Sequence, residues 1–213
     1  MTDLVTAFVT LFVVVDPIGL APLFIALTRG MDARRRRAVG LRACLIAAGL
    51  MTLFGLFGEH ILSGIGISMP AFRIAGGALL FLTALDMLFE RRTQRREGQS
   101  AESAADAEDD PSIFPLATPL IGGPGAFATM ILLAGEGGGQ WRHVAAIHGV
   151  MLAVLACVMV MFLLAGPIER LLGRTGTLVV TRLLGMLLAA LAVQFMLDGL
   201  RGAGVVPMLP RGR

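Results

Sequence analysis

The chain contains no lysine, no tyrosine, two cysteines and one tryptophan, and only 15% of its 213 residues are charged. Without lysine there is no Gly-x-x-x-x-Gly-Lys-Ser/Thr loop, which argues against nucleotide-driven chemistry. Cys44 and Cys157 lie in separate apolar stretches without a second ligand at a suitable spacing, so we predict neither a disulfide nor a metal site. No apolar stretch carries paired carboxylates, a His-x-x-x-His spacing or a Gly-x-Ser-x-Gly elbow. We therefore expect no enzyme activity, no catalytic residue and no cofactor.

What the chain has instead is apolar sequence, with 56% hydrophobic residues and a mean hydropathy of +0.80. Its charges are clustered, and the stretches between the clusters are long enough to span a bilayer. Residues 1–10 contain no Arg, and the first stretch is longer than a signal-peptide core, so we expect it to remain in the mature protein. The six predicted spans are 4–28, 38–58, 69–89, 113–134, 144–165 and 177–199.

Arginine clusters predict the orientation. They lie between the first two spans (29–42), after the third (91–96) and after the fifth (170–174), which is one side of a six-span protein. The positive-inside rule makes that side cytoplasmic and both termini periplasmic, although Arg201, Arg211 and Arg213 count against it. The run Arg34–Arg37 is interpreted as a topology signal rather than a nucleic-acid site; it could also contact anionic lipid. The acidic, polar segment 91–112 is predicted to be a disordered cytoplasmic linker.

Three landmarks occur twice in the same order. Asp16-Pro17 matches Gly123-Pro124, 107 residues further on. Glu59-His60-Ile61-Leu62 matches Glu169-Arg170-Leu171-Leu172 at an offset of 110. Arg73-x-x-Gly76 matches Arg182-x-x-Gly185 at an offset of 109. Each half has an odd number of spans, so the second half must cross the membrane in the opposite sense. The predicted fold is an all-α membrane protein with two inverted-topology three-helix repeats, 1–90 and 113–200, and a short tail, 201–213.

Two breaks interrupt the first and fourth spans near their middles, at residues 16–19 and 122–125. In each, a proline follows a residue suited to an N-cap, which predicts that the helix stops and restarts as a half-helix. A restarted helix has free N–H groups and the positive end of its dipole, which favour an anionic group such as a carboxylate. The predicted binding residues are Asp16, Pro17, Ile18, Gly19, Pro22, Gly122, Gly123, Pro124, Gly125 and Ala126.

Asp16 is the one carboxylate expected near mid-membrane depth, where a charge is costly and is a functional candidate. Two interpretations stay open: Asp16 only caps its half-helix, or it also binds a proton, a cation or a substrate ammonium. Pro22 could bind substrate or simply kink the helix.

Four further residues are candidates for gating or ion coupling, namely Arg73, Thr83, Asp86 and Arg182. Thr83, Asp86 and Glu90 share a helix face with Gly76, and Arg91 or Arg92 could neutralise the two acids at the membrane surface. The alternative for Arg73 and Arg182 is snorkelling to lipid headgroups. His143 and His148 are predicted to be structural histidines.

Two motifs resemble signatures of the MarC family of bacterial inner-membrane proteins. The first is Leu11–Phe24 with Leu27-Thr28, and the second is Pro115–Ala126 at the start of the fourth span. The family usually has Asn where Leu20 stands here. The resemblance implies a six-span plasma-membrane protein related to LysE-type exporters, with small neutral amino acids as substrates.

These observations favour a secondary transporter that binds a small zwitterion between the two half-helices. An ion gradient of protons or sodium, or the substrate's own gradient, would drive transport. The expected partners are membrane lipids and the small solute, and a homo-oligomer is left open. The alternative is a non-transporting membrane scaffold or accessory subunit.

Overall fold

The computed structural model describes residues 4–91 and 111–206, and every regular element in these two ranges is helical. Most of the predicted linker and the last residues of the tail lie outside the described residues. The elements are α1 (Leu4–Val15), α2 (Pro17–Leu27), α3 (Ala33–Gly64), α4 (Met69–Leu88), η1 (Ser112–Ile121), α6 (Pro124–Gly135), α7 (Trp141–Leu163) and α8 (Ala165–Gly202). The predicted all-α class is confirmed.

The helices are long and apolar enough for a multi-span membrane protein. Five candidate spans occur in the described residues: Leu4–Leu27, which combines α1 and α2, then α3, α4, α7 and Thr175–Gly202. η1 and α6, which meet at a bend of 57°, make a sixth if they are counted as one span. The span count predicted from hydropathy therefore agrees with the structure at the level of five or six.

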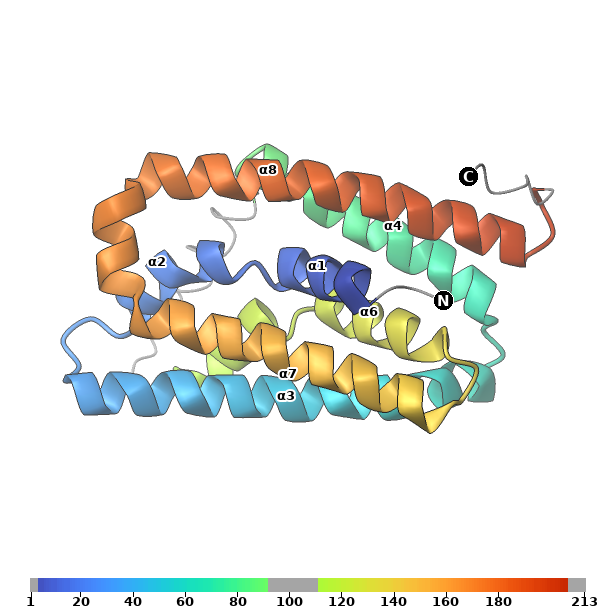
Figure 1. The fold of residues 1–213 in the computed structure, drawn as a ribbon, viewed down its shortest axis with the longest axis horizontal. Helices are drawn as coiled ribbons and strands as arrows, with labels where there is room; N and C mark the ends of the chain where they lie inside the picture. The colour runs from blue at the N-terminus through green and yellow to red at the C-terminus, as the bar shows by residue number, and fades with distance from the viewer. Residues whose placement is uncertain (1–3, 92–110, 207–213) are drawn as a thin grey trace.

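The first candidate span lies inside the bundle. In its most apolar window 61% of residues are buried, against 28% to 33% for the other four. α1 contacts α6, α7 and α8, and α2 contacts α7 and α8. Figure 1 shows α1, α2 and α6 between the α4–α8 pair and the α3–α7 pair. The outer helices keep apolar side chains exposed along their lengths, as expected of surfaces that face lipid.

Two helices are longer than their hydropathy predicted. α3 begins at Ala33, because Asp32 accepts a hydrogen bond from Arg35 N at 2.6 Å and acts as its N-cap. The arginine run is therefore part of the helix instead of a loop. α8 begins at Ala165, with only Leu164 between it and α7, so residues 170–174, predicted to lie between the fifth and sixth spans, are part of this helix. Its one non-helical residue, Gly173 (φ 58°), separates a short first part, which crosses one end of the molecule in Figure 1, from the long span.

α4 and α8 form an antiparallel pair that packs through glycines. A Cβ at Gly77 would lie 2.8 Å from Ala192 O, and one at Gly199 would lie 2.9 Å from Pro70 O. At Gly185 a Cβ would lie 3.0 Å from Met87 Cβ. Glycine lets the backbones approach this closely, which is a common way to associate helices in lipid. The contacts run in opposite directions along the two helices, so the pair is antiparallel, as Figure 1 shows.

Candidate functional site

Asp16 is the hinge residue between α1 and α2. Its backbone is left-handed (φ 59°, ψ 64°), and its side chain accepts a hydrogen bond from Gly19 N at 3.1 Å. Only 1% of Asp16 is exposed. A left-handed conformation costs roughly 1–3 kcal/mol for a residue with a side chain, and the surrounding packing must maintain it. The carboxylate is therefore held both as the N-cap of α2 and inside the bundle.

Gly19 provides the space that the Asp16 carboxylate occupies. A Cβ at Gly19 would lie 2.8 Å from Asp16 Cγ and 3.0 Å from Oδ1. With Asp16 in its left-handed conformation, the carboxylate occupies the space that a side chain at residue 19 would need. The Asp-Pro-x-Gly pattern is thus a cap in which the last residue makes room for the first.

Gly19→Ala is expected to displace the Asp16 side chain and remove its cap, at a cost of about 0.5–2 kcal/mol in stability. Resistance to unfolding by sodium dodecyl sulfate in mixed micelles measures this loss. Gly49→Ala is the matched control, because a Cβ at that helical position of α3 meets nothing within 4 Å. Equal stability of the two variants would contradict the role assigned to Gly19.

The second break has a different construction. Gly122 N donates to Ala117 O at 2.9 Å, and a Cβ at Gly123 would lie 2.8 Å from Pro119 O. The two glycines let the chain fold back against η1, which has non-helical backbone at Phe114 and Thr118. α6 then begins at Pro124, and its N-cap, Gly123, provides no side-chain hydrogen bond. Pro124 has no N–H and Phe127 N donates to Gly123 O at 3.1 Å, so Gly125 and Ala126 are the two residues of the first turn whose N–H groups have no acceptor within α6.

The start of α6 lies against the end of α1 and against α4. A Cβ at Gly125 would lie 3.5 Å from Val14 Cγ1 and 3.8 Å from Thr83 Oγ1. The Thr83 hydroxyl donates to Leu79 O at 2.9 Å, and its oxygen keeps accepting capacity. The structure therefore brings together the last turn of α1, Thr83 and the uncapped first turn of α6.

The remaining predicted binding residues belong to α2 and α6 and differ in exposure. Pro17 and Ala126 are buried, Ile18 is partly exposed, and Pro22 is exposed in the middle of α2. Asp86, also partly exposed, lies one turn beyond Thr83 on α4. Within the described residues no group of three or more His, Cys, Asp or Glu is placed to hold a metal ion.

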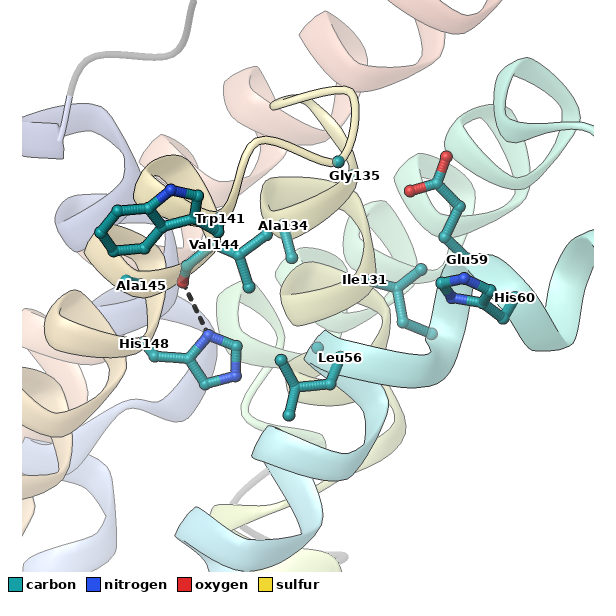
Figure 2. A pocket seen from close by; sticks show the side chains of 12 residues that line it. Leu56, Glu59, His60, Ile131, Ala134, Gly135, Trp141, Val144, Ala145 and His148 are labelled. Carbon is teal, nitrogen blue, oxygen red and sulfur yellow. Dashed lines mark hydrogen bonds between the residues drawn. The ribbon is translucent and has the colours of Figure 1, made fainter.

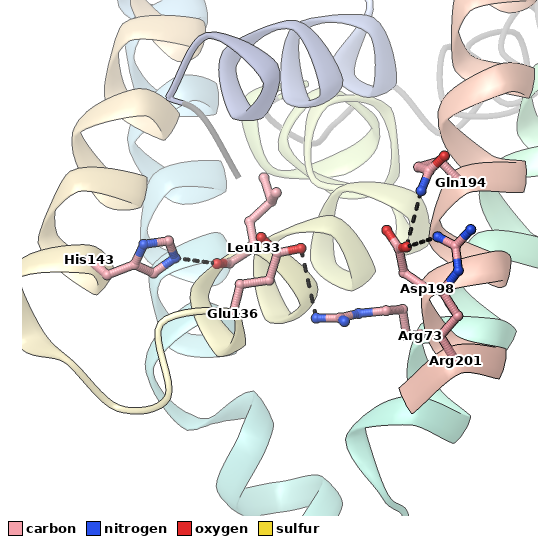
Figure 3. Close-up of polar contacts among 7 residues, drawn as sticks. All are labelled: Arg73, Leu133, Glu136, His143, Gln194, Asp198 and Arg201. Carbon is pink, nitrogen blue, oxygen red and sulfur yellow. Dashed lines mark hydrogen bonds and ion pairs between the residues drawn. The ribbon is translucent and has the colours of Figure 1, made fainter. Parts of the chain in front are cut away.

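The two predicted gating arginines form ion pairs at opposite ends of α4. Arg73 lies 3.7 Å from Glu136, the residue that follows α6, as Figure 3 shows. Arg182 on α8 pairs with Glu90. The sequence predicted Arg91 or Arg92 as the partner of Glu90, and the structure instead links Glu90 to α8. The sequence contained no signal for Glu136, because a partner on another helix cannot be inferred from spacing along the chain.

His143 is a structural histidine: its Nε2 donates to Leu133 O at 2.8 Å, in the last turn of α6 (Figure 3). His148 Nδ1 lies 2.7 Å from Val144 O, while its Nε2 is buried and has no hydrogen-bond partner. The structural role predicted for His148 therefore accounts for Nδ1 and leaves Nε2 unexplained. His148 also lies in the wall of a cavity that sequence reasoning missed.

Comparison with known proteins identifies the family. The MarC family of integral membrane proteins matches residues 1–204. The chain belongs to the MarC family. The inner-membrane protein YhgN of Escherichia coli K12, a UPF0056 protein, is 33% identical over 201 residues, which cover 94% of this chain and 98% of YhgN.

Archaeal relatives match over similar lengths. A UPF0056 membrane protein of Archaeoglobus fulgidus is 37% identical over 194 residues, covering 91% of this chain and 90% of the relative. One from Methanocaldococcus jannaschii is 33% identical over 199 residues, covering 93% and 96%. No solved structure matches the chain. The predicted MarC resemblance is therefore confirmed across the chain.

Proposed function

We propose that this MarC family member is a secondary transporter of small neutral amino acids in the bacterial plasma membrane. Its substrate binds between Asp16 and the first turn of α6, near mid-membrane depth. The observation that carries the proposal is a carboxylate, 1% exposed, at a helix break inside a 24-residue apolar span. An acid in such a place is costly and typically handles protons, cations or substrate.

The two helix starts offer complementary groups to a zwitterion. The first turn of α6 offers the N–H groups of Gly125 and Ala126 and the positive end of a helix dipole, which suit the substrate carboxylate. Asp16 offers a negative charge to the ammonium. α1 and α6 are in contact, and Val14 packs beside Gly125, which supports a shared site. The side chains of Val14 and Leu80 both lie close to Gly125, so the proposed substrate is a small one.

An inverted repeat of the two halves is part of this proposal. α4 and α8 are the third spans of the two halves and pack against each other in opposite directions. Asp16 is almost fully buried, so transport requires the surrounding helices to separate on one side and then on the other. Arg73–Glu136 and Arg182–Glu90 join helices at opposite ends of α4 and are candidates for the contacts that break alternately.

Uptake by purified protein in liposomes tests the proposal. Radiolabelled small neutral amino acids are compared with and without an imposed proton or sodium gradient, and empty liposomes are the control. We expect saturable uptake of at least one of them. No uptake or exchange of any amino acid under either gradient would contradict the proposal and favour the scaffold alternative.

The proposed orientation places the start of α3 in the cytoplasm and its end in the periplasm. In a background without Cys44 and Cys157, Ala33→Cys and Ser63→Cys put thiols at two exposed positions at opposite ends of this helix. A membrane-impermeant thiol reagent added to whole cells should label the variant at position 63 and spare the variant at 33 until the membrane is opened. The reverse pattern would contradict the arrangement inferred from the arginine clusters.

A further inference from the structure

A cavity of about 420 Å³ lies where α3 and α6 approach their ends and α7 begins. It is separate from the proposed transport site: Gly135, in its wall, is about 16 Å along α6 from Pro124. Figure 2 shows His148 pointing into it from α7 and Glu59 and His60 at its rim on α3. Its volume is in the range of sites for small molecules.

His148 places a hydrogen-bond acceptor in the wall of this cavity, beside Gly55. Its Nδ1 is 2.7 Å from Val144 O, and because a carbonyl can only accept, Nδ1 must carry a proton. In the neutral ring Nε2 then has a lone pair and no hydrogen, and this buried atom has no partner. Gly55 leaves room for the ring, since a Cβ there would lie 3.1 Å from Nε2. A buried acceptor without a donor is costly, so a ligand with N–H groups is favoured.

Other groups at the cavity also favour positive charge. Glu59 adds a carboxylate, and its Oε2 would lie 3.9 Å from a Cβ at Gly135, the last residue of α6. The end of a helix carries the negative end of its dipole. Arg142 follows Trp141 in the chain but does not line the cavity. Its guanidinium lies 5.7 Å from the centre of the Trp141 ring.

We propose that this cavity binds the primary ammonium group of a small solute, with Nε2 of His148 accepting one N–H and Glu59 balancing the charge. A free carboxylate would instead face Glu59 and the carbonyl end of α6. The proposal does not depend on the proposed transport site, because it concerns binding at different residues.

Trp141 makes the test direct, because it lines the cavity and is the only tryptophan in a chain without tyrosine. Purified protein is titrated with propylammonium chloride at neutral pH while Trp141 fluorescence is recorded. Sodium propionate and 1-propanol, matched in length, control for anion binding and for partitioning into detergent. We expect a saturable change with propylammonium alone. No saturable change with propylammonium, or equal saturable changes with any of the controls, would overturn the proposal.

Two variants locate the binding. His148→Phe keeps a flat ring without the acceptor, and Glu59→Gln removes the charge at an exposed position, so each should weaken propylammonium binding about tenfold. Asp198→Asn is the matched control: this acid pairs with Arg201, lies outside the cavity, and its variant should bind like the parent. If His148→Phe does not fold, the propylammonium affinity of Glu59→Gln tests the site. Unchanged affinity in the folded cavity variants, or an equal loss in Asp198→Asn, would overturn the site.

Discussion

Asp16→Asn is expected to fold and insert like the parent chain while losing at least about tenfold of its amino acid uptake. Asparagine is a good N-cap and tolerates left-handed backbone, so it can occupy the position of Asp16 and accept from Gly19 N. It cannot carry the negative charge that a proton or a substrate ammonium requires. Charged hydrogen bonds are worth about 1.5–3 kcal/mol, which corresponds to tenfold or more in binding. Initial rates of uptake in proteoliposomes, normalised to inserted protein, measure the loss.

Two further variants separate charge from structure. Asp16→Ala removes the cap as well and should reduce both stability and uptake. Asp198→Asn is the control for removing a carboxylate elsewhere, because Asp198 is half-exposed and pairs with Arg201 at 3.0 Å (Figure 3). Uptake by Asp16→Asn at the parent rate would show that capping alone explains the residue, and the transport site would have to be placed elsewhere.

Gly77→Ala is expected to destabilise the bundle by about 1–3 kcal/mol, the usual cost of overpacking. The new Cβ would meet Ala192 O at 2.8 Å and Met196 N at 3.0 Å, and backbone atoms cannot rotate away as a side chain can. The two helices would have to move apart along their contact. Unfolding by sodium dodecyl sulfate in mixed micelles measures the change.

Gly149→Ala should change stability in the opposite direction. A Cβ at this position of α7 meets nothing within 4 Å, so the substitution only improves helix propensity, by up to about 1 kcal/mol. The pair of variants therefore compares the same chemical change with and without a backbone neighbour. Equal effects of the two would contradict the close packing of α4 on α8.

The sequence predicted those features of the fold that depend on residues adjacent in the chain. Asp16 and Pro17 predicted a helix start from capping preference and the missing N–H of proline, and α2 begins there. Gly123 and Pro124 predicted another, and α6 begins there. The length of α8 was missed because a hydropathy window ends at charged residues, whereas Arg and Glu are good helix formers that extend a helix beyond the apolar part.

The candidate site was predictable only as far as it is local. The role of Gly19 depends on where the Asp16 carboxylate turns, and that of Gly123 on the position of Pro119 O, so their spatial reasons appear only in the folded chain. The contact of Gly125 with Thr83, the Arg73–Glu136 pair and the cavity at His148 each join distant segments. One sequence contains no measure of such proximity.

The glycine contacts between α4 and α8 restrict how this molecule can move. No layer of side chains separates the two helices at Gly77, Gly185 and Gly199, so we expect α4 and α8 to move together as a rigid pair. Thr83 is on α4, within this pair, and lies close to the start of α6. Any tilt that admits water to the buried carboxylate must therefore carry both outer helices together, with the opening on the side of α3 and α7.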